Sequence, residues 1–164
     1  MSTDAIVLLK EDHKEIKRLF REFERADDAR SRSEKADEIV RALTVHTYLE
    51  DEVMYPRIRA EVPDLAEEMD QAHQEHHVAD LLCAEIADMD GDHPELVAKV
   101  AVLADAVTRH IDTEEHDWFP RVREALGRKR LQDIGERLLT VGRTAPRRPE
   151  RPTVLQKVAD ALSQ

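Results

Sequence analysis

Residues 46–59 read HTYLEDEVMYPRIR, and residues 110–123 repeat the pattern as HIDTEEHDWFPRVR. Each copy opens with His-x-x-x-Glu and closes with an aromatic residue, proline, arginine, an aliphatic residue and arginine. Positions four residues apart share one face of a helix, so each copy points an imidazole and a carboxylate in the same direction. The repeat predicts a helical protein built from two similar halves.

An acid-His pair precedes each copy of the motif: Asp12-His13 comes before the first copy, and Glu75-His76 comes before the second. Each half therefore spells acid-His, a long spacer and His-x-x-x-Glu. Imidazoles and carboxylates from four helices can converge on one buried point, where they form a ligand set for a pair of transition-metal ions. The predicted metal ligands are His13, His46, Glu50, His76, His110 and Glu114.

The composition favours long helices in a single domain. Of the 164 residues, 37% are charged and only 4% are aromatic, a balance that suits helices better than sheets. The net charge of −11 argues against a general nucleic-acid binder. Cys83 is the one cysteine, which excludes an internal disulfide and fits a reducing compartment. No apolar run approaches the roughly 20 residues that cross a bilayer, and the N-terminus lacks a signal-peptide pattern. We therefore expect a cytoplasmic protein without membrane contact.

Apolar residues recur at helical spacing in four long segments. We expect helices over about residues 4–26, 34–60, 63–90 and 94–119, with a polar turn at 25–34. Short connections between long helices predict an all-α, up-down-up-down four-helix bundle.

Additional short C-terminal helices are expected beyond the bundle. Apolar residues after Gly127 predict a short fifth helix, so residues 1–142 form the expected metal-binding domain. Residues 143–164 form an expected extension, a Pro/Arg-rich linker followed by a short amphipathic helix. This tail is a candidate site for a protein partner.

Helical wheels place His13, His46 and His110 within apolar stripes. A single histidine in such a stripe is more often a packed core residue than a ligand. Several buried ionisable groups, however, would be costly unless they were paired or bound to metal. The repeated pattern therefore favours metal binding.

The segment 63–90 offers three histidines. His76 lies near the middle of its apolar stripe, whereas His77 lies well to one side and is expected to face solvent. His73 lies at the edge of the stripe. It either packs at the boundary of the core or serves as an additional metal ligand, and the sequence does not choose between these roles.

The carboxylates beside the motifs differ in the faces they occupy. Asp51, Glu52 and Glu115 lie off the predicted ligand face and are expected to be ordinary surface charges. Asp117 lies one turn below Glu114, where it either hydrogen-bonds a ligand imidazole or faces solvent.

These residues resemble the hemerythrin-like HHE cation-binding family, whose signature is H…HxxxE…H…HxxxE on a four-helix bundle. The resemblance covers roughly residues 4–125. It implies a non-haem di-iron centre with bridging carboxylates that binds dioxygen or a related oxidant. Oxygen-carrying hemerythrins have HxxxH on the third helix and HxxxxD on the fourth. Here His73-x-x-x-His77 mimics the first motif, but after His110 the chain has Glu114 at i+4 and Glu115, not Asp, at i+5. That departure argues against simple reversible oxygen carriage.

The expected cofactor is two non-haem iron ions with a bridging oxo or hydroxo group, for which manganese or zinc can substitute. The six ligands leave coordination positions open to a small diatomic or peroxide ligand. Ferritin-like di-iron bundles use Glu-x-x-His, and this chain contains no such sequence.

Three functions fit these observations. The site binds or consumes O₂, peroxide or nitric oxide, in oxidative or nitrosative defence or in sensing. Alternatively, it handles iron without turnover. In the third reading, its metal state regulates a partner through residues 143–164. Whether the protein is an enzyme directed at peroxide or nitric oxide is left open by the sequence.

Overall fold

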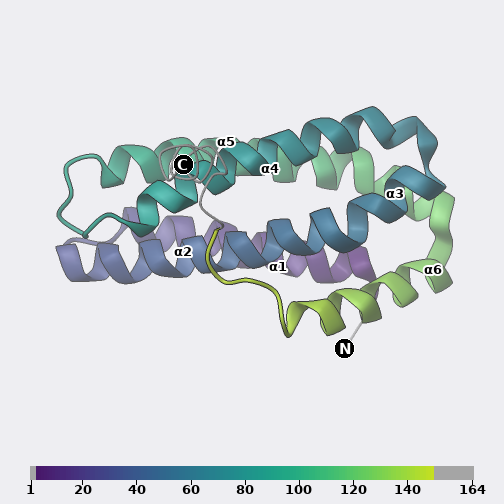
Figure 1. Cartoon of the computed structure of the whole chain (residues 1–164), viewed down its shortest axis with the longest axis horizontal. Helices are drawn as coiled ribbons and strands as arrows, with labels where there is room; N and C mark the ends of the chain where they lie inside the picture. Colours follow the sequence, from purple (N-terminus) through teal and green to yellow (C-terminus); the bar gives the residue numbers. More distant parts are fainter. Residues whose placement is uncertain (1–2, 150–164) are drawn as a thin grey trace, which may run out of the picture.

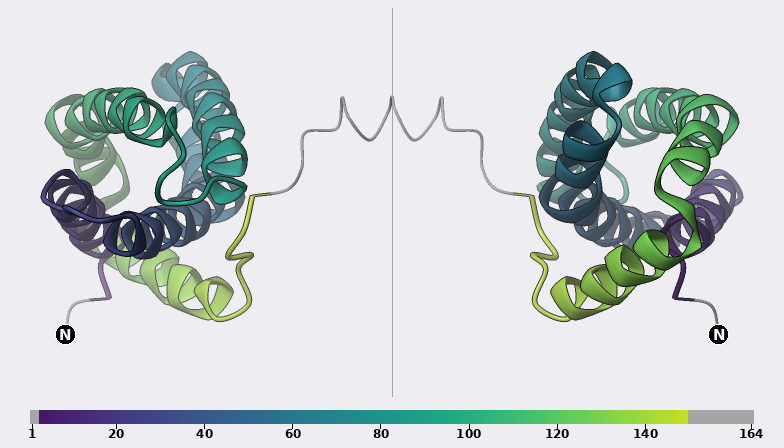
Figure 2. Two further views of the ribbon diagram at one scale, coloured as in Figure 1. Left: turned by 90° about the vertical axis from the view of Figure 1, so that its left-hand side faces the viewer. Right: turned by 90° about the vertical axis from the view of Figure 1, so that its right-hand side faces the viewer.

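The computed structural model describes residues 3–149, which are helical with no strand in that range. Four long helices form the bundle, α1 (Ala5–Glu24), α2 (Ala29–Leu49), α4 (Ala66–Ala87) and α5 (Leu96–Thr113). Figure 1 shows the bundle from the side, and the end-on views of Figure 2 show the four helices around a common axis. The predicted all-α four-helix bundle is confirmed.

Aspartate caps fix the starts of the first two helices. Asp4 accepts a hydrogen bond from the Val7 N–H at 3.1 Å, and Asp28 accepts one from the Ser31 N–H at 2.8 Å. Such caps satisfy backbone donors that have no partner inside the helix. The Asp28 cap lets α2 begin at Ala29, so the turn expected at 25–34 is much shorter than the sequence suggested.

The helices α2 and α5 each continue through a π-helical turn, η1 (Glu50–Met54) and η3 (Glu114–Trp118). Beyond these turns run α3 (Tyr55–Glu61) and α6 (Phe119–Gly142). A proline, Pro56 or Pro120, occupies the second position after each π turn. Proline lacks a backbone N–H and crowds the preceding helical turn, and a π turn accommodates this by its wider hydrogen-bond spacing. The repeated aromatic-Pro dipeptide thus interrupts the expected continuous helices.

The remaining elements close the bundle. The short 3₁₀ helix η2 (Pro63–Leu65) leads into α4. In α6, Gly127 has φ of 69°, a left-handed conformation that glycine adopts easily, and the chain bends there. The helix continues beyond Gly127, where a short fifth helix was expected; this segment buries Leu131, Ile134 and Leu138, and α6 packs against α1. The predicted C-terminal amphipathic helix lies outside the described residues.

The hydrophobic core is divided into two clusters by a polar layer. One cluster includes Leu9, Met54 and Met69, and the other includes Ile16, Leu43 and Cys83. In α1, α2 and α4 a histidine lies in the sequence between residues of the two clusters, and in α5 His110 lies near the last residue of the second cluster, Ile111. Burying such a layer is costly unless its members satisfy one another or bind a ligand. Within residues 3–149, no helix is both long and apolar enough to cross a membrane.

Candidate metal centre

The structure brings the six predicted ligands together in the polar layer, all of them buried. They form two groups that share Glu50, and the candidate ligand atoms within each group lie within 4.8 Å of one another. The first group is His13, His46, Glu50 and Glu114, and the second is Glu50, His76 and His110. Each of the four bundle helices contributes one imidazole, and the two π turns begin at the two glutamates.

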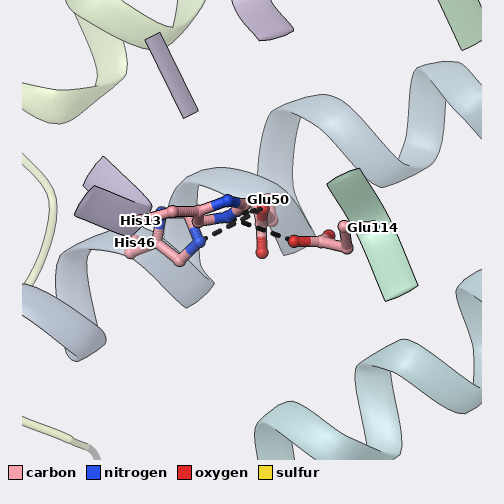
Figure 3. A group of neighbouring side chains, drawn as sticks. All are labelled: His13, His46, Glu50 and Glu114. Atoms are coloured by element: carbon pink, nitrogen blue, oxygen red, sulfur yellow. Dashed lines mark ion pairs between the residues drawn. The ribbon is translucent and has the colours of Figure 1, made fainter. Parts of the chain in front are cut away.

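In the first group, imidazole nitrogens and carboxylate oxygens lie within ion-pair distance of one another, as the dashed lines of Figure 3 mark. Nε2 of His13 lies 3.2 Å from Oε2 of Glu114, and Nε2 of His46 lies 3.2 Å from Oε1 of Glu50. These four buried atoms have no hydrogen-bond partner among the described residues. Unpaired buried polar atoms are rare and costly in proteins, and four that converge on one point fit a bound cation.

In the second group, a tyrosine hydroxyl lies among the ligands. Nε2 of His76 and Nε2 of His110 are 3.1 Å apart, and the Tyr55 hydroxyl lies 3.3 Å from the first and 3.0 Å from the second. The hydroxyl donates a hydrogen bond to Oε1 of Glu114 at 2.5 Å. Sequence reasoning missed Tyr55. The signal was the aromatic-Pro pair, because the π turn that accommodates Pro56 rotates Tyr55 toward the face of Glu50.

The two halves differ at this aromatic position. Phe119 occupies in the second copy the place that Tyr55 occupies in the first. Its ring stacks on His13, with ring centroids 5.9 Å apart, while Tyr55 stacks on His76 at 5.2 Å. Each copy of the motif therefore places an aromatic ring against a ligand imidazole, but only the ring of the first copy carries a hydroxyl.

The Nδ1–H of each ligand imidazole contacts a different carboxylate, on the side of the ring away from the metal-facing Nε2. We call these four acids, which lie outside the ligand groups, the outer carboxylates. The four pairs are His13–Glu115 at 2.8 Å, His46–Asp12 at 3.3 Å, His76–Asp51 at 3.0 Å and His110–Glu75 at 2.5 Å. Hydrogen bonds of this kind fix the orientation of an imidazole and direct its other nitrogen toward a metal.

The expectation that Asp51 and Glu115 are ordinary surface charges was wrong. Each lies on the flank of its helix, next to the neighbouring helix, and reaches the imidazole that this neighbour carries. A helical wheel describes one helix at a time and does not show such a contact. Glu52, by contrast, is exposed as expected.

Charges compensate within the centre. Burial lowers the pKa of His13, but the neighbouring carboxylates of Glu114 and Glu50 outweigh it and raise the pKa to about 9. The same balance raises the pKa of His76 to about 9 and that of His110 to about 10. Burial raises the pKa of Glu50, but the charge of His46 and the nearby imidazoles of His13 and His76 hold it well below its usual range.

The remaining candidates lie outside both groups. The His73 side chain is 59% exposed, and its Nδ1 lies 3.2 Å from Oδ1 of Asp51. His77 is exposed, as expected. Asp117 faces solvent and lies 3.6 Å from the Arg121 guanidinium. Of the two alternatives for Asp117, a hydrogen bond to a ligand imidazole or exposure to solvent, the structure shows the second.

Comparisons with known proteins agree with this arrangement. The family model described as the hemerythrin HHE cation binding domain matches residues 4–122. The crystal structure of a hemerythrin HHE cation binding domain-containing protein from Mycobacterium kansasii covers 86% of each chain with a TM-score of 0.73 and 24% identity, a likeness of fold. A DNA nickase of Nostoc sp. is 27% identical over 125 residues, which are 76% of this chain and 35% of the nickase. The chain thus spans about a third of that relative's length.

Proposed function

The chain belongs to the hemerythrin HHE cation-binding domain family, and we propose that its six converging side chains hold two iron ions. Imidazole and carboxylate ligands together suit iron or manganese better than metals that prefer thiolates, and zinc can substitute. The four unpaired buried atoms of the first group support a cation at that point.

The positions of the two glutamates are the observation that carries this proposal. Oε1 of Glu50 lies beside His46 of the first group, while its Oε2 lies 3.2 Å from Nε2 of His76 of the second. Oε2 of Glu114 lies beside His13, while its Oε1 lies 3.6 Å from Nε2 of His110. Each carboxylate therefore presents one oxygen to each group, the arrangement that a bridge between two metal ions requires.

We infer that the function is to bind or consume a small oxidant, O₂, peroxide or nitric oxide, in defence or sensing. When bound, the iron pair supplies redox chemistry and open coordination positions for such ligands. The ligand side chains are buried, and the outer carboxylates hold the imidazoles in place. Tyr55 supplies a buried hydrogen-bond donor within the second group.

The experiment is metal analysis combined with absorption spectra of the iron-loaded protein before and after O₂, peroxide or nitric oxide is added. About two irons per chain and a spectral change with one oxidant are expected. A single metal bound by only part of the six residues would contradict the proposal. Iron exchange with no response to any oxidant would favour the alternative, an iron-handling or regulatory module without turnover.

A further inference from the structure

A cavity of about 400 Å³ lies between α2, α4 and α5, where the imidazoles of His46, His76 and His110 form part of its inner wall. Val78, which is 53% exposed, and the exposed Arg109 also line the cavity, so it reaches the protein surface. Pockets that bind organic ligands start at roughly 300 Å³. The cavity is therefore large enough for a small organic molecule that enters from solvent.

The inner wall offers no hydrogen bond to such a molecule. The three imidazoles are engaged elsewhere, because each Nδ1 contacts an outer carboxylate and each Nε2 lies within the metal centre. The Thr47 hydroxyl donates to a backbone carbonyl of its own helix at 3.0 Å. The part of a ligand that lies against this wall is therefore apolar. The rest of the inner wall is apolar side chains, Leu43, Ala79, Ala106, Val107 and Ile111.

The surface end of the cavity has three polar side chains, and two of them are already paired. The Thr113 hydroxyl donates to the Arg109 carbonyl at 3.0 Å, and the Glu75 carboxylate accepts from Nδ1 of His110 and from a glutamine of α4. Nε of Arg109 donates to the Asp105 carbonyl at 3.4 Å, but its two terminal nitrogens have no hydrogen-bond or ion-pair partner among residues 3–149. The polar group left for a ligand is thus a guanidinium, whose N–H groups match a carboxylate.

We propose that the cavity binds an organic monocarboxylate, with its apolar body in the cavity and its carboxylate on the Arg109 guanidinium. An apolar wall beside one unpaired cation matches a molecule with an apolar body and a negatively charged end. Glu75 lies at the same end and repels further negative charge, so the ligand carries one carboxylate rather than two. This site needs no metal ion and goes beyond the function proposed above.

The test is calorimetric titration of the full chain, zinc-loaded and metal-free, with octanoate and with 1-octanol. Octanoate should bind both forms saturably and at least tenfold more tightly than the uncharged alcohol, because only the carboxylate pairs with the guanidinium. Arg109→Gln should remove this advantage and leave binding of the alcohol unchanged. Arg21→Gln is the matched control, because Arg21 and Arg109 both line a second hollow, between α1 and α5, but Arg21 does not line the cavity.

Two further variants test the apolar wall. Ala106→Phe places a ring inside the cavity and should abolish binding of both compounds. Ala104→Phe is its control, since Ala104 is also partly buried in α5 but lines hollows beside α1 instead of the cavity. Val78→Trp, at the exposed mouth, leaves the core unchanged and should weaken octanoate binding, so it provides the same test if Ala106→Phe does not fold.

Octanoate binding that is weakened in Arg109→Gln and in the cavity variants, with both controls like the wild type, supports the proposal. The absence of octanoate binding, an affinity no greater than that of the alcohol, or equal losses in Arg21→Gln and Arg109→Gln overturns it. Octanoate that binds only the zinc-loaded form and is retained in Arg109→Gln contacts the metal, which also overturns the cavity site. Because the metal-free chain is titrated as well, a failure of the metal-centre function leaves this test intact.

Discussion

Nδ1 of His13, near the start of the chain, lies 2.8 Å from Oε1 of Glu115, which follows the second His-x-x-x-Glu motif. This contact crosses between α1 and η3, the π turn that follows α5. Asp51 and His76 make the corresponding contact between η1, the π turn that follows α2, and α4. Asp12 of α1 contacts His46 of α2, and Glu75 of α4 contacts His110 of α5. Each pair of adjacent helices in the four-helix bundle is thus joined by one outer carboxylate and one ligand imidazole.

We expect Glu115→Gln and Asp51→Asn to weaken metal binding about 10–100-fold, the usual loss when a group that orients a metal ligand is removed. The helical wheel alone predicted no effect for these residues. Competition with a chelator measures the affinity of each variant for the metal. Glu52→Gln is the control, since Glu52 is exposed in the same π turn. Unchanged affinity in both outer-carboxylate variants would show that these contacts do not orient the imidazoles.

The bridging positions of Glu50 and Glu114 predict a larger effect. Removing either carboxylate leaves several buried imidazoles without their counter-charge, so Glu50→Ala and Glu114→Ala should each lower the free energy of unfolding of the metal-free protein by about 3–5 kcal/mol. Both should also bind less than the full metal complement. Chemical denaturation and metal analysis provide the two measurements. If Glu50→Ala retained two metals per chain, the bridging assignment would be wrong.

The sequence was sufficient for the bundle and for the convergence of the six residues because both depend on periodicity. Repeated apolar spacing defines the inward face of each helix, and His13, His46, His76 and His110 lie on that face. Features that depend on a local departure from regular geometry were not predicted. The early start of α2 depends on the Asp28 cap, and the position of Tyr55 depends on a π turn.

Contacts between side chains of different helices could not be predicted from the sequence either. Asp51 and Glu115 act on imidazoles of adjacent helices, so their role depends on which helices are neighbours and how far apart they lie. The repeat does contain a hint, because an acid follows the glutamate in both copies. Without the packing, that acid cannot be distinguished from the many charges on the surface.

Tyr55→Phe should lower the free energy of unfolding of the metal-free protein by about 1–3 kcal/mol, because it removes a buried donor from the Glu114 carboxylate. The ring itself should be tolerated, since phenylalanine already occupies the equivalent position, 119. Denaturant unfolding measures the change. Tyr48→Phe is the control, because Tyr48 is only partly buried and has no hydroxyl hydrogen bond among the described residues. Equal effects of the two substitutions would contradict a specific role for the Tyr55 hydroxyl.

We expect no retention of duplex DNA by the purified protein in a mobility-shift assay at physiological salt. Asp and Glu number 36 against 25 Lys and Arg, and the net charge of −11 repels a phosphate backbone. The likeness to the Nostoc nickase makes this test informative, because the chain covers only a third of that protein. Salt-sensitive DNA binding would show that a local basic surface outweighs the net charge.

The Asp4–Arg123 pair predicts how stability depends on pH. Arg123 Nη1 lies 2.9 Å from Oδ2 of Asp4 and ties the start of α1 to α6. Partial burial raises the pKa of Asp4, but the hydrogen bonds from Arg123 and the Val7 N–H outweigh it, so the pKa in the folded protein lies below 3.8. The ionised carboxylate therefore stabilises the folded state above the unfolded pKa, and this contribution is lost as pH falls through the lower, folded value.

Arg123→Gln should accordingly make the unfolding free energy less dependent on pH below about pH 4, because it brings the Asp4 pKa closer to its unfolded value. Thermal unfolding at a series of acidic pH values measures this. Arg59→Gln is the matched control, since Arg59 is the equivalent arginine of the first repeat and pairs with the exposed Asp70. Asp4→Asn retains a side chain that can cap α1 and should lose the same pH dependence as Arg123→Gln. A wild-type pH profile in both Asp4→Asn and Arg123→Gln would mean that this ion pair does not contribute to acid stability.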